Sequence, residues 1–327
     1  MSDKTGIAWT DATWNPVTGC AKVSVGCTHC YAEREWPRLS APGRSGSSVY
    51  QGRKFTDVRC HEERLDQPLR WKRPRRIFVN SMSDLFHEDV PDDFLDRVFK
   101  VMQTARQHTY QVLTKRPERM QRFLSERVSV PAFTGPFPAM ARHIWLGVSV
   151  ENQAAADERI PPLLATPAAV RLVSAEPLLA PVDLSPWLVA DMGDRGRPRL
   201  NLLHWVIVGG ESGPKARPCE VAWVRSIVEQ CQTAGTACFV KQLGAQPRGD
   251  CTFRWAHDRD HHPAPEWLDE DGVLPSASGK PPHDLCHAFD ASWTPCKPKL
   301  RDRSGSDPSE WPDDLRVRQM PEVPCPF

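Results

Sequence analysis

Three cysteines stand close together near the start of the chain, with six residues between Cys20 and Cys27 and two between Cys27 and Cys30. The C-x2-C pair can turn both sulfurs toward one point, and the longer segment can loop Cys20 back to the same place. Gly19 and Gly26 predict sharp backbone bends beside two of the thiols. A structural zinc site takes four protein ligands, so three thiolates without an obvious fourth predict a metal centre with one open position. Iron–sulfur clusters are also held by cysteine thiolates.

The same spacing leaves other interpretations open. A zinc site that borrows His29, Cys60 or His61 as its fourth ligand is one of them. A C-x2-C redox pair is another, although a third nearby cysteine and the aromatic Tyr31 are not part of that pattern. Chance clustering of free thiols is a third, because the chain has 11 cysteines.

Composition places the chain among globular proteins without a membrane span. It has 327 residues, of which 40% are hydrophobic and 25% charged, and contains no run of 18 apolar residues. The polar segment Met1–Gly6 lacks the apolar stretch of a signal peptide. We therefore expect a cytoplasmic protein with no membrane partner, whose cysteines are reduced thiols or metal ligands rather than disulfides.

Charge is balanced overall but not locally. The net charge of +1 predicts no general attraction to nucleic acid. The stretch Arg53–Arg76, however, carries nine Lys and Arg against four Asp and Glu, and Trp71 stands among its last cations. Aromatic side chains interleaved with cations suit phosphates and exposed bases. This stretch is either a nucleic-acid contact or a solvated helix face.

Short apolar segments rich in β-branched residues alternate with amphipathic segments from residue 76 to residue 240. This rhythm predicts parallel βαβ units. No G-x-G-x-x-G turn supports a doubly wound sheet. We expect an α/β fold with a full or partial TIM-like barrel of about six or seven parallel strands. The predicted strands are Ile7–Trp9, Arg76–Asn80, Thr109–Leu113, Ile144–Val148, Val170–Val173, His204–Val208 and Ala237–Val240. The predicted helices are Tyr31–Trp36, ending at Pro37, then Asp92–Gln107, Arg116–Arg127, Gln153–Leu164 and Val221–Ala234.

Polar and charged residues follow every predicted strand, where barrel enzymes build their active sites. Asp84, Glu151, Glu176, Glu211 and Lys241 are expected to converge on one rim together with the cysteine loop.

The periodicity stops near Gly244. We expect a barrel over residues 1–244 and an irregular, Pro-rich extension over residues 245–327 packed against it, with the segment Arg301–Pro312 as an extended tail. Residues 38–54 are predicted to be a loop. A second metal site fits no zinc spacing well, and its candidate ligands are His283, Cys286, His287 and Cys296.

Taken together, these features resemble a phage- and prophage-borne family that is grouped with the radical S-adenosylmethionine (SAM) barrels. The resemblance rests on the three cysteines, the strand–helix series and three further motifs, and it runs from Gly6 to about Pro321. The further motifs are Val208–Gly213, Phe239–Gly244 and Asp307–Pro312. If the gene is phage-borne, the cytoplasm is that of the host cell.

The resemblance implies a cofactor and a set of roles. Cys20, Cys27 and Cys30 would ligate three irons of a [4Fe–4S] cluster, and SAM would bind the fourth. His29 would contact the adenine. Candidate cosubstrate-binding residues at the strand ends are Asn80, Ser81, Asp84, Ser149, Glu151, Glu176, Glu211 and Lys241. The cysteine gap of six residues, rather than three, and the absence of a Gly-Gly-Glu stretch after the second strand depart from the superfamily pattern.

The expected function is therefore a radical SAM-like enzyme that cleaves SAM to a 5′-deoxyadenosyl radical and modifies a substrate. Nucleic acid or a nucleotide is the leading substrate hypothesis, and an electron donor such as flavodoxin or ferredoxin is the expected partner. Two alternatives belong to other classes. One is a zinc-stabilised nucleic-acid-binding protein, and the other is a non-catalytic barrel with a structural cluster.

Overall fold

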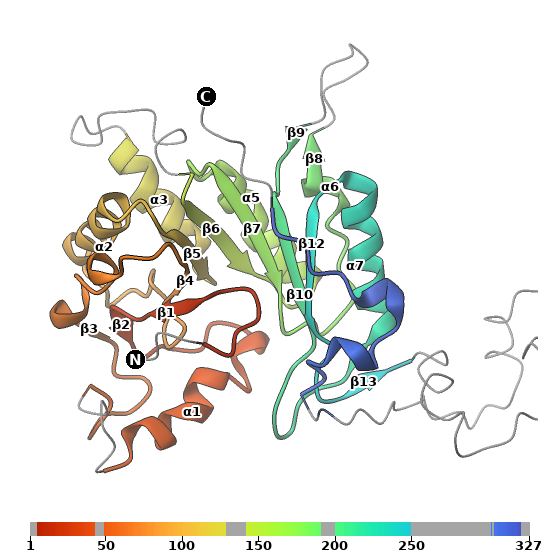
Figure 1. The fold of residues 1–327 in the computed structure, drawn as a ribbon, viewed down its shortest axis with the longest axis horizontal. Helices are drawn as coiled ribbons and strands as arrows, with labels where there is room; N and C mark the ends of the chain where they lie inside the picture. Colours follow the sequence, from red (N-terminus) through yellow and green to blue (C-terminus); the bar gives the residue numbers. More distant parts are fainter. Residues whose placement is uncertain are drawn as a thin grey trace, which may run out of the picture.

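The fold is a parallel sheet of seven strands curled into a half-barrel (Figure 1). The computed structural model describes residues 5–42, 49–128, 142–190, 200–249, 302 and 304–321. Neighbouring strands are parallel throughout the sheet, so all their carboxyl ends lie at one edge. The predicted α/β class and partial barrel are confirmed. In sheet order the strands are β1 (Ala12–Trp14), β4 (Arg76–Val79), β5 (Thr109–Thr114), β6 (Ile144–Ser149), β7 (Val170–Ala175), β10 (Trp205–Gly209) and β12 (Ala237–Gln242).

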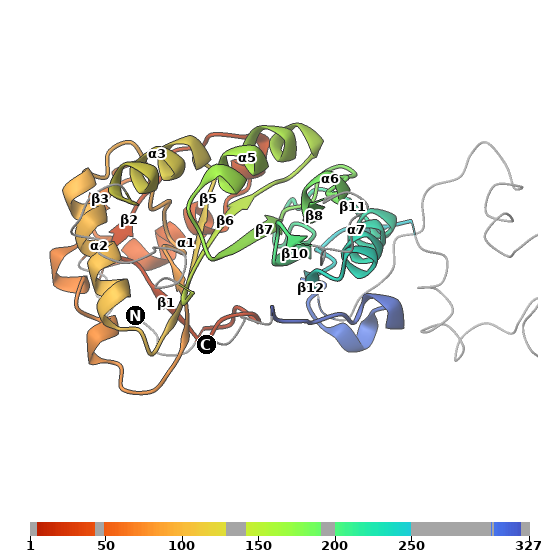
Figure 2. The same cartoon turned by 90° about the horizontal axis from the view of Figure 1, so that it is seen from above.

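Amphipathic helices cover the convex face of this sheet (Figure 2). They are α2 (Asp92–Thr104), α3 (Pro117–Val128), α5 (Gln153–Ala165) and α7 (Val221–Ala234). Helix α2 shows the pattern, because Phe94, Val98 and Met102 recur at helical spacing and are all buried. In the described part of the chain, no helix is both long enough and apolar enough to cross a membrane.

Short elements complete the frame. The small strands are β2 (Val17–Thr18), β3 (Arg59–Cys60), β8 (Val189–Ala190), β9 (Leu200–Asn201), β11 (Cys219–Glu220) and β13 (Pro247–Arg248). The remaining α-helices are α1 (Tyr31–Ser40) and α6 (Ser185–Leu188). Single 3₁₀ turns are η1 (Val25–Cys27), η2 (Glu62–Arg64), η3 (Pro68–Arg70), η6 (Pro308–Glu310) and η7 (Asp313–Leu315).

The concave face changes from aromatic to small and polar along the strands. Trp145 and Trp205 pack near its lower end with ring centroids 5.8 Å apart. Side chains alternate across a strand, so Ser149, four residues after Trp145, faces the same side as the tryptophan. Ser174 likewise faces inward, two residues after Leu172. The half-barrel is thus filled at its amino-terminal end, and small side chains line it where the strands finish.

The expected first strand, Ile7–Trp9, is wrong. Strand β1 begins at Ala12, and the Trp9 side chain instead packs, buried, against the concave face of the sheet. Its ring centroid lies 4.8 Å from that of Phe78 and 6.0 Å from that of Trp205. The apolar character of this run therefore reflects the burial of Trp9 inside the half-barrel, not a place in the sheet.

The predicted end of the first helix is also wrong, because α1 continues through Pro37 to Ser40. Trp36, one residue earlier, is buried and packs edge-on against Tyr50 and Phe55. This packing stabilises the helix across the proline. Residues 38–40, expected in a loop, are accordingly helical, while residues 43–48 lie outside the described part.

The described C-terminal segment returns to the open edge of the sheet. Val317 accepts a hydrogen bond from Val240 N, and Gln319 N donates to Cys238, so the segment pairs with β12 in the antiparallel sense. The Trp205 indole donates to the Gln319 carbonyl at 2.9 Å. The predicted tail Arg301–Pro312 contains η6, and η7 follows directly after it. Residues 250–301 lie outside the described part, as do all four candidate ligands of the second metal site.

Removing the Trp205 side chain should destabilise the fold strongly. The residue is fully buried among aromatic rings, and truncation of such a residue to alanine costs about 3–5 kcal/mol because it leaves a cavity. We expect Trp205→Ala to lower the free energy of urea unfolding by that amount. Trp223→Ala on α7, where the tryptophan is half-buried, serves as the control and should cost clearly less. Equal losses would contradict the packing described.

Candidate active site

The loop that carries the cysteines follows β1 and β2 at the carboxyl edge of the sheet. Gly19 is held in place by a hydrogen bond from its N–H to Met82 O, and Cys20 N donates to Phe55 O. Gly19 has φ +90°, and a Cβ there would lie 2.4 Å from the Asp57 carbonyl oxygen. Only glycine fits this close approach, so the predicted bend at Gly19 is confirmed.

Gly26 is needed for a different reason from the predicted bend. Its backbone is not in the left-handed region, but a Cβ would lie 2.9 Å from the Glu151 carboxylate carbon. The Gly26 N–H donates to Glu151 Oε1 at 3.4 Å. Gly26 therefore lets a buried carboxylate approach the backbone directly before Cys27.

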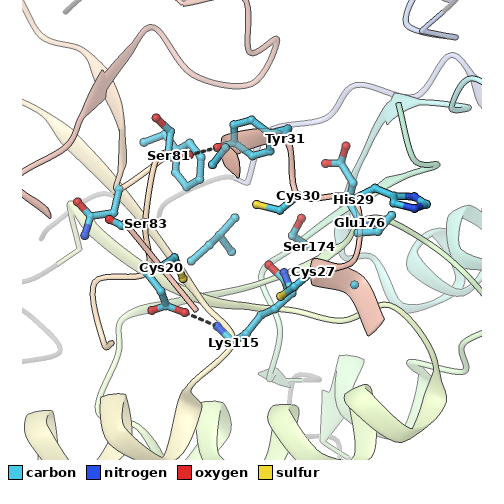
Figure 3. A pocket seen from close by; sticks show the side chains of 18 of the residues that line it. Cys20, Cys27, His29, Cys30, Tyr31, Ser81, Ser83, Lys115, Ser174 and Glu176 are labelled. Carbon is cyan, nitrogen blue, oxygen red and sulfur yellow. Dashed lines mark hydrogen bonds between the residues drawn. The ribbon is translucent and has the colours of Figure 1, made fainter. Parts of the chain in front are cut away.

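The three thiols point into one shared space (Figure 3). Cys20, Cys27 and Cys30 are free and half-buried, and all three line a cavity of about 460 Å³ at the mouth of the half-barrel. Cys27 lies at the end of η1, and Cys30 immediately precedes α1. The cysteine loop therefore lies beside the strand ends, and its three thiols line one cavity there.

Two charged side chains, Asp84 and Arg116, act on the Cys20 thiol. Burial raises the pKa of its thiol to about 11, and the charge of Asp84 adds to this rise, while Arg116 opposes it. Arg116 Nη1 lies 3.8 Å from the Cys20 sulfur. This guanidinium is placed to stabilise a thiolate at Cys20.

Among the described residues, no group of three or more His, Cys, Asp or Glu side chains is arranged to hold a single metal ion. Two of the fourth ligands considered for zinc lie elsewhere. His61 is hydrogen-bonded through one ring nitrogen to Thr18 and through the other to Glu63, at 2.8 and 3.2 Å. Neither His61 nor Cys60 lines the cavity.

Most of the predicted strand-end residues do surround this cavity. Eight of the nine non-cysteine candidates line the cavity, and Glu151 is the exception. Those that line it are His29, Asn80, Ser81, Asp84, Ser149, Glu176, Glu211 and Lys241. The apolar part of the lining includes Ile7, Trp9, Phe55, Phe78 and Leu113.

Asn80 lines the cavity and carries a buried amide nitrogen without a hydrogen-bond partner. It follows β4 with φ 61°, a conformation that asparagine tolerates better than most residues. Its Oδ1 accepts from Val17 N at 3.3 Å, while its buried Nδ2 has no hydrogen-bond partner. An unsatisfied buried donor is costly, which makes a bound acceptor at this position favourable.

Asp84 is occupied by the protein itself. Its oxygens accept hydrogen bonds from Thr114 Oγ1, at 2.7 Å, and from Arg116 Nη1, at 3.2 Å. The backbone N–H groups of Phe86 and Lys115 also donate to it. Asp84 thereby joins the end of β4 to the end of β5 and holds Arg116 beside Cys20.

Glu176 and Lys241 form an ion pair across the ends of β7 and β12. Lys241 Nζ and Gln242 Nε2 both donate to Glu176 Oε1, at 2.6 and 2.8 Å. The side chain of Glu176 is 15% exposed and that of Lys241 is 27% exposed, so each retains hydrogen-bonding capacity toward the cavity.

Glu211 is committed to His29 and Arg217. Its Oε2 accepts from His29 Nδ1 at 3.0 Å, and its Oε1 accepts from Arg217 Nη2 at 2.6 Å. Burial alone would raise the pKa of Glu211, but hydrogen bonds from Arg217 and His29 outweigh it and lower the pKa to about 2. Arg217 Nη1 also donates to the Val25 carbonyl at 2.7 Å, which ties the cysteine loop to the end of β10.

Glu151 lies beneath the cysteine loop rather than in the cavity lining. It is 1% exposed and pairs with Arg159 of α5, whose Nη1 lies 2.9 Å from Oε2. Burial opposes its ionisation, but Ser24 and Arg159 lower the pKa of Glu151 overall. With its contact to Gly26, this carboxylate supports the loop from below.

Several residues that line or support the cavity were predictable from the sequence only in their location, and others were not predictable at all. Arg116 and Gln242 follow predicted strands, so their location at the rim was foreseeable. No sequence pattern predicted a role for Arg159 or Arg217, because each pairs with a carboxylate whose position depends on the folded sheet. Phe55 lines the cavity from within the stretch Arg53–Arg76, where the sequence pointed to the cations and Trp71 instead.

The basic stretch Arg53–Arg76 does not form one continuous surface at the cavity. Arg53 donates to Thr18, the buried Arg64 donates to the Asn15 carbonyl, and Arg76 pairs with Asp11. Residues 70–75 precede β4 and lie at the amino-terminal edge of the sheet, while the cavity lies at the carboxyl edge.

Acid should weaken the fold partly through Glu211. Its folded-state pKa of about 2 lies below the ordinary value of 4.5, so its contribution to stability is complete above about pH 4.5 and is lost as the pH falls toward 2. We expect Glu211→Gln to lower the free energy of unfolding near neutral pH and to flatten its decline in that acidic window. Urea unfolding at a series of pH values measures both. Glu229→Gln, at an exposed position of α7, should leave the decline unchanged; an unaltered decline in Glu211→Gln would refute the assignment.

Comparison with known proteins places the chain in a family but gives it no described activity. No curated protein and no solved structure matches the chain. Residues 4–273 match the model of the family described as "Protein of unknown function (DUF5131)". This match covers most of the chain, and the protein therefore belongs to that family.

Proposed function

We propose that the protein is an iron–sulfur enzyme of the radical SAM type. In this proposal Cys20, Cys27 and Cys30 hold a [4Fe–4S] cluster, and SAM binds in the adjoining cavity. The observation that carries the proposal is the position of the three thiols. They face a shared space at the mouth of a parallel half-barrel, beside the ends of its strands.

The donor set fits a cluster better than a single ion. In a cluster each thiolate binds a different iron, so the sulfurs surround a common volume without meeting at one point. Arg116 beside Cys20 supplies positive charge to a thiolate ligand. We therefore assign the three cysteines as cluster ligands.

The cavity also fits a cosubstrate of SAM's size and polarity. Its volume of about 460 Å³ lies within the range of about 300–1,000 Å³ that small-molecule sites occupy. Asn80 offers an unused donor, Ser149 offers a hydroxyl, and the Glu176–Lys241 pair faces a zwitterionic ligand with both signs of charge. Trp9 and Phe78 provide apolar surface. These residues bind and orient the ligand and exclude water from it.

When bound, the cluster and SAM supply reductive cleavage of the sulfonium to methionine and a 5′-deoxyadenosyl radical, which removes hydrogen from a substrate. The chain's own part is to hold the thiols in place. Glu151 and Glu211 do so through Gly26 N, Arg217 and His29. The cations at residues 70–75 lie at the far edge of the sheet and give no support to nucleic acid as the substrate, so the proposal leaves the substrate open.

The zinc alternative is weaker, because two of its three suggested fourth ligands lie away from the cavity and the third, His29, is hydrogen-bonded to Glu211. It predicts one zinc per chain and no SAM binding. A structural cluster without catalysis predicts iron and sulfide but no cleavage of SAM.

Loss of one cavity thiol should abolish both the cluster and the reaction. We expect Cys27→Ala, after anaerobic reconstitution, to lose its iron, its sulfide and the formation of 5′-deoxyadenosine under dithionite. The matched control is Cys60→Ala, which removes a half-buried thiol that does not line the cavity and should retain all three. A brown and active Cys27→Ala protein would overturn the ligand assignment.

Exchanging the unused Asn80 donor for an acceptor should weaken SAM binding. Asn80→Asp keeps the oxygen that Val17 N contacts and replaces the unpartnered Nδ2. Loss of one such hydrogen bond corresponds to about a tenfold weaker affinity. Equilibrium dialysis of SAM against the reconstituted protein measures it, with urea unfolding to show that the fold persists. Unchanged affinity would remove Asn80 from the proposed site.

A further inference from the structure

Three polar side chains stand in a row across neighbouring strand ends inside the cavity. They are Lys115 directly after β5, Ser149 at the end of β6 and Ser174 near the end of β7. Figure 3 shows Lys115 and Ser174 in the space that the thiols face. Ser149 pairs with Ser174 in the sheet, and Thr114 pairs with Val148, which puts Lys115 level with Ser149. Neighbouring strands lie about 4.8 Å apart, so this polar row spans about 10 Å.

An apolar floor lies directly beneath the polar row. Two residues earlier on the same three strands are Leu113, Gly147 and Leu172, which pair across the sheet. The two leucines close over the glycine, because a Cβ on Gly147 would lie 2.5 Å from Leu172 Cγ and 2.9 Å from Leu113 Cδ2. The polar row therefore rests on hydrocarbon, where an ionic contact is less screened than at the open surface.

The side chains of the polar row are unused within the described residues. Lys115 makes its hydrogen bond there through its backbone N–H, which donates to Asp84 Oδ2 at 3.0 Å. Ser149 is contacted through its carbonyl, which accepts from Arg159 Nη1 at 2.8 Å. The ammonium group and the two hydroxyls are thus all available to a ligand. One cation flanked by hydroxyl donors is the complement of an oxyanion.

The positive charge of Lys115 is also left without a carboxylate partner among the described residues. Two buried acids lie near it: Asp84, which accepts from its backbone N–H, and Glu151, which lies within reach of its charge. Each acid already pairs with an arginine, Asp84 with Arg116 at 3.2 Å and Glu151 with Arg159 at 2.9 Å. The lysine therefore attracts an anion into the cavity.

We propose that the polar row binds the oxyanion group, phosphate or carboxylate, of an anionic substrate. Lys115 contributes the charge, and the serine hydroxyls donate to the remaining oxygens. The inference rests on the proposed function, because it gives the oxyanion to the substrate and leaves SAM to Asn80 and the Glu176–Lys241 pair. Ser149 serves both ligands, since a hydroxyl has one donor and two acceptor positions. It donates to the oxyanion and accepts from SAM.

A role for Lys115 in tuning the cluster is the alternative, and it makes a different prediction. A tuning cation acts on the cluster whether or not an anion is present. An oxyanion site, in contrast, binds its anion before any cluster has been assembled.

Calorimetric titration of the full chain before reconstitution tests the site independently of the cluster and of SAM cleavage. The probes are inorganic phosphate and, separately, acetate, at constant ionic strength. Lys115→Met removes the charge but keeps a long side chain, and Ser174→Ala removes one hydroxyl. Lys22→Met is the matched control, since Lys22 is exposed, pairs with Glu33 and does not line the cavity. Urea unfolding shows whether each variant keeps its fold.

We expect the native chain to bind at least one of the two anions. Lys115→Met should weaken that binding by about tenfold or more, because it removes a charge-assisted contact, and Ser174→Ala should weaken it by about fivefold. Lys22→Met should bind like the native chain. The probe that binds more tightly identifies the oxyanion that the substrate carries.

No binding of either anion by the native chain would refute the proposal, as would equal losses in Lys115→Met and Lys22→Met. If Lys115→Met binds both anions normally but shifts the reduction potential of the cluster, the lysine belongs to the cluster instead. Displacement of the anion by saturating SAM in the reconstituted protein would assign the polar row to the cosubstrate and also contradict the inference. A native chain that binds the anion but forms no 5′-deoxyadenosine under dithionite would defeat the proposed function and leave the anion site standing.

Discussion

Two buried carboxylates, Glu151 and Glu211, hold the cysteine loop over the end of the sheet, and the candidate site depends on them. Glu151 pairs with Arg159 and accepts from Gly26 N, while Glu211 pairs with Arg217 and accepts from His29. A buried charge is costly without a partner, and each carboxylate is paired with an arginine. Each also accepts a further hydrogen bond from a group of the cysteine loop. The thiols are thus placed by contacts with β6 and β10, far along the chain, rather than by their own spacing.

The parallel sheet makes these contacts possible. Because all seven strands run in one direction, residues separated by more than a hundred positions finish at the same edge. Tryptophans fill the lower part of the concave face, and Ser149 and Ser174 leave room above them. The cavity exists because side-chain size falls along the strands, while the cysteine loop covers the space that remains.

Much of this architecture was predictable from local pattern. From β4 onward, short β-branched segments followed by amphipathic segments predicted each βα unit, and polar residues after the strands indicated the rim. Ile7–Trp9 failed because an apolar run reports burial without revealing whether a strand pairs with it. Glu151 shows the other limit. Its position at the rim was foreseeable, but its role depends on Arg159 and on a glycine 125 residues earlier, a contact that only the folded sheet creates.

The central claim is that three sulfurs hold one cluster and leave an iron open to SAM. Electron paramagnetic resonance of the reduced, reconstituted protein tests it most directly, alongside iron and sulfide analysis. The account predicts about four irons and four sulfides per chain and a signal that changes when SAM is added. One zinc per chain, or a cluster signal indifferent to SAM, would contradict it.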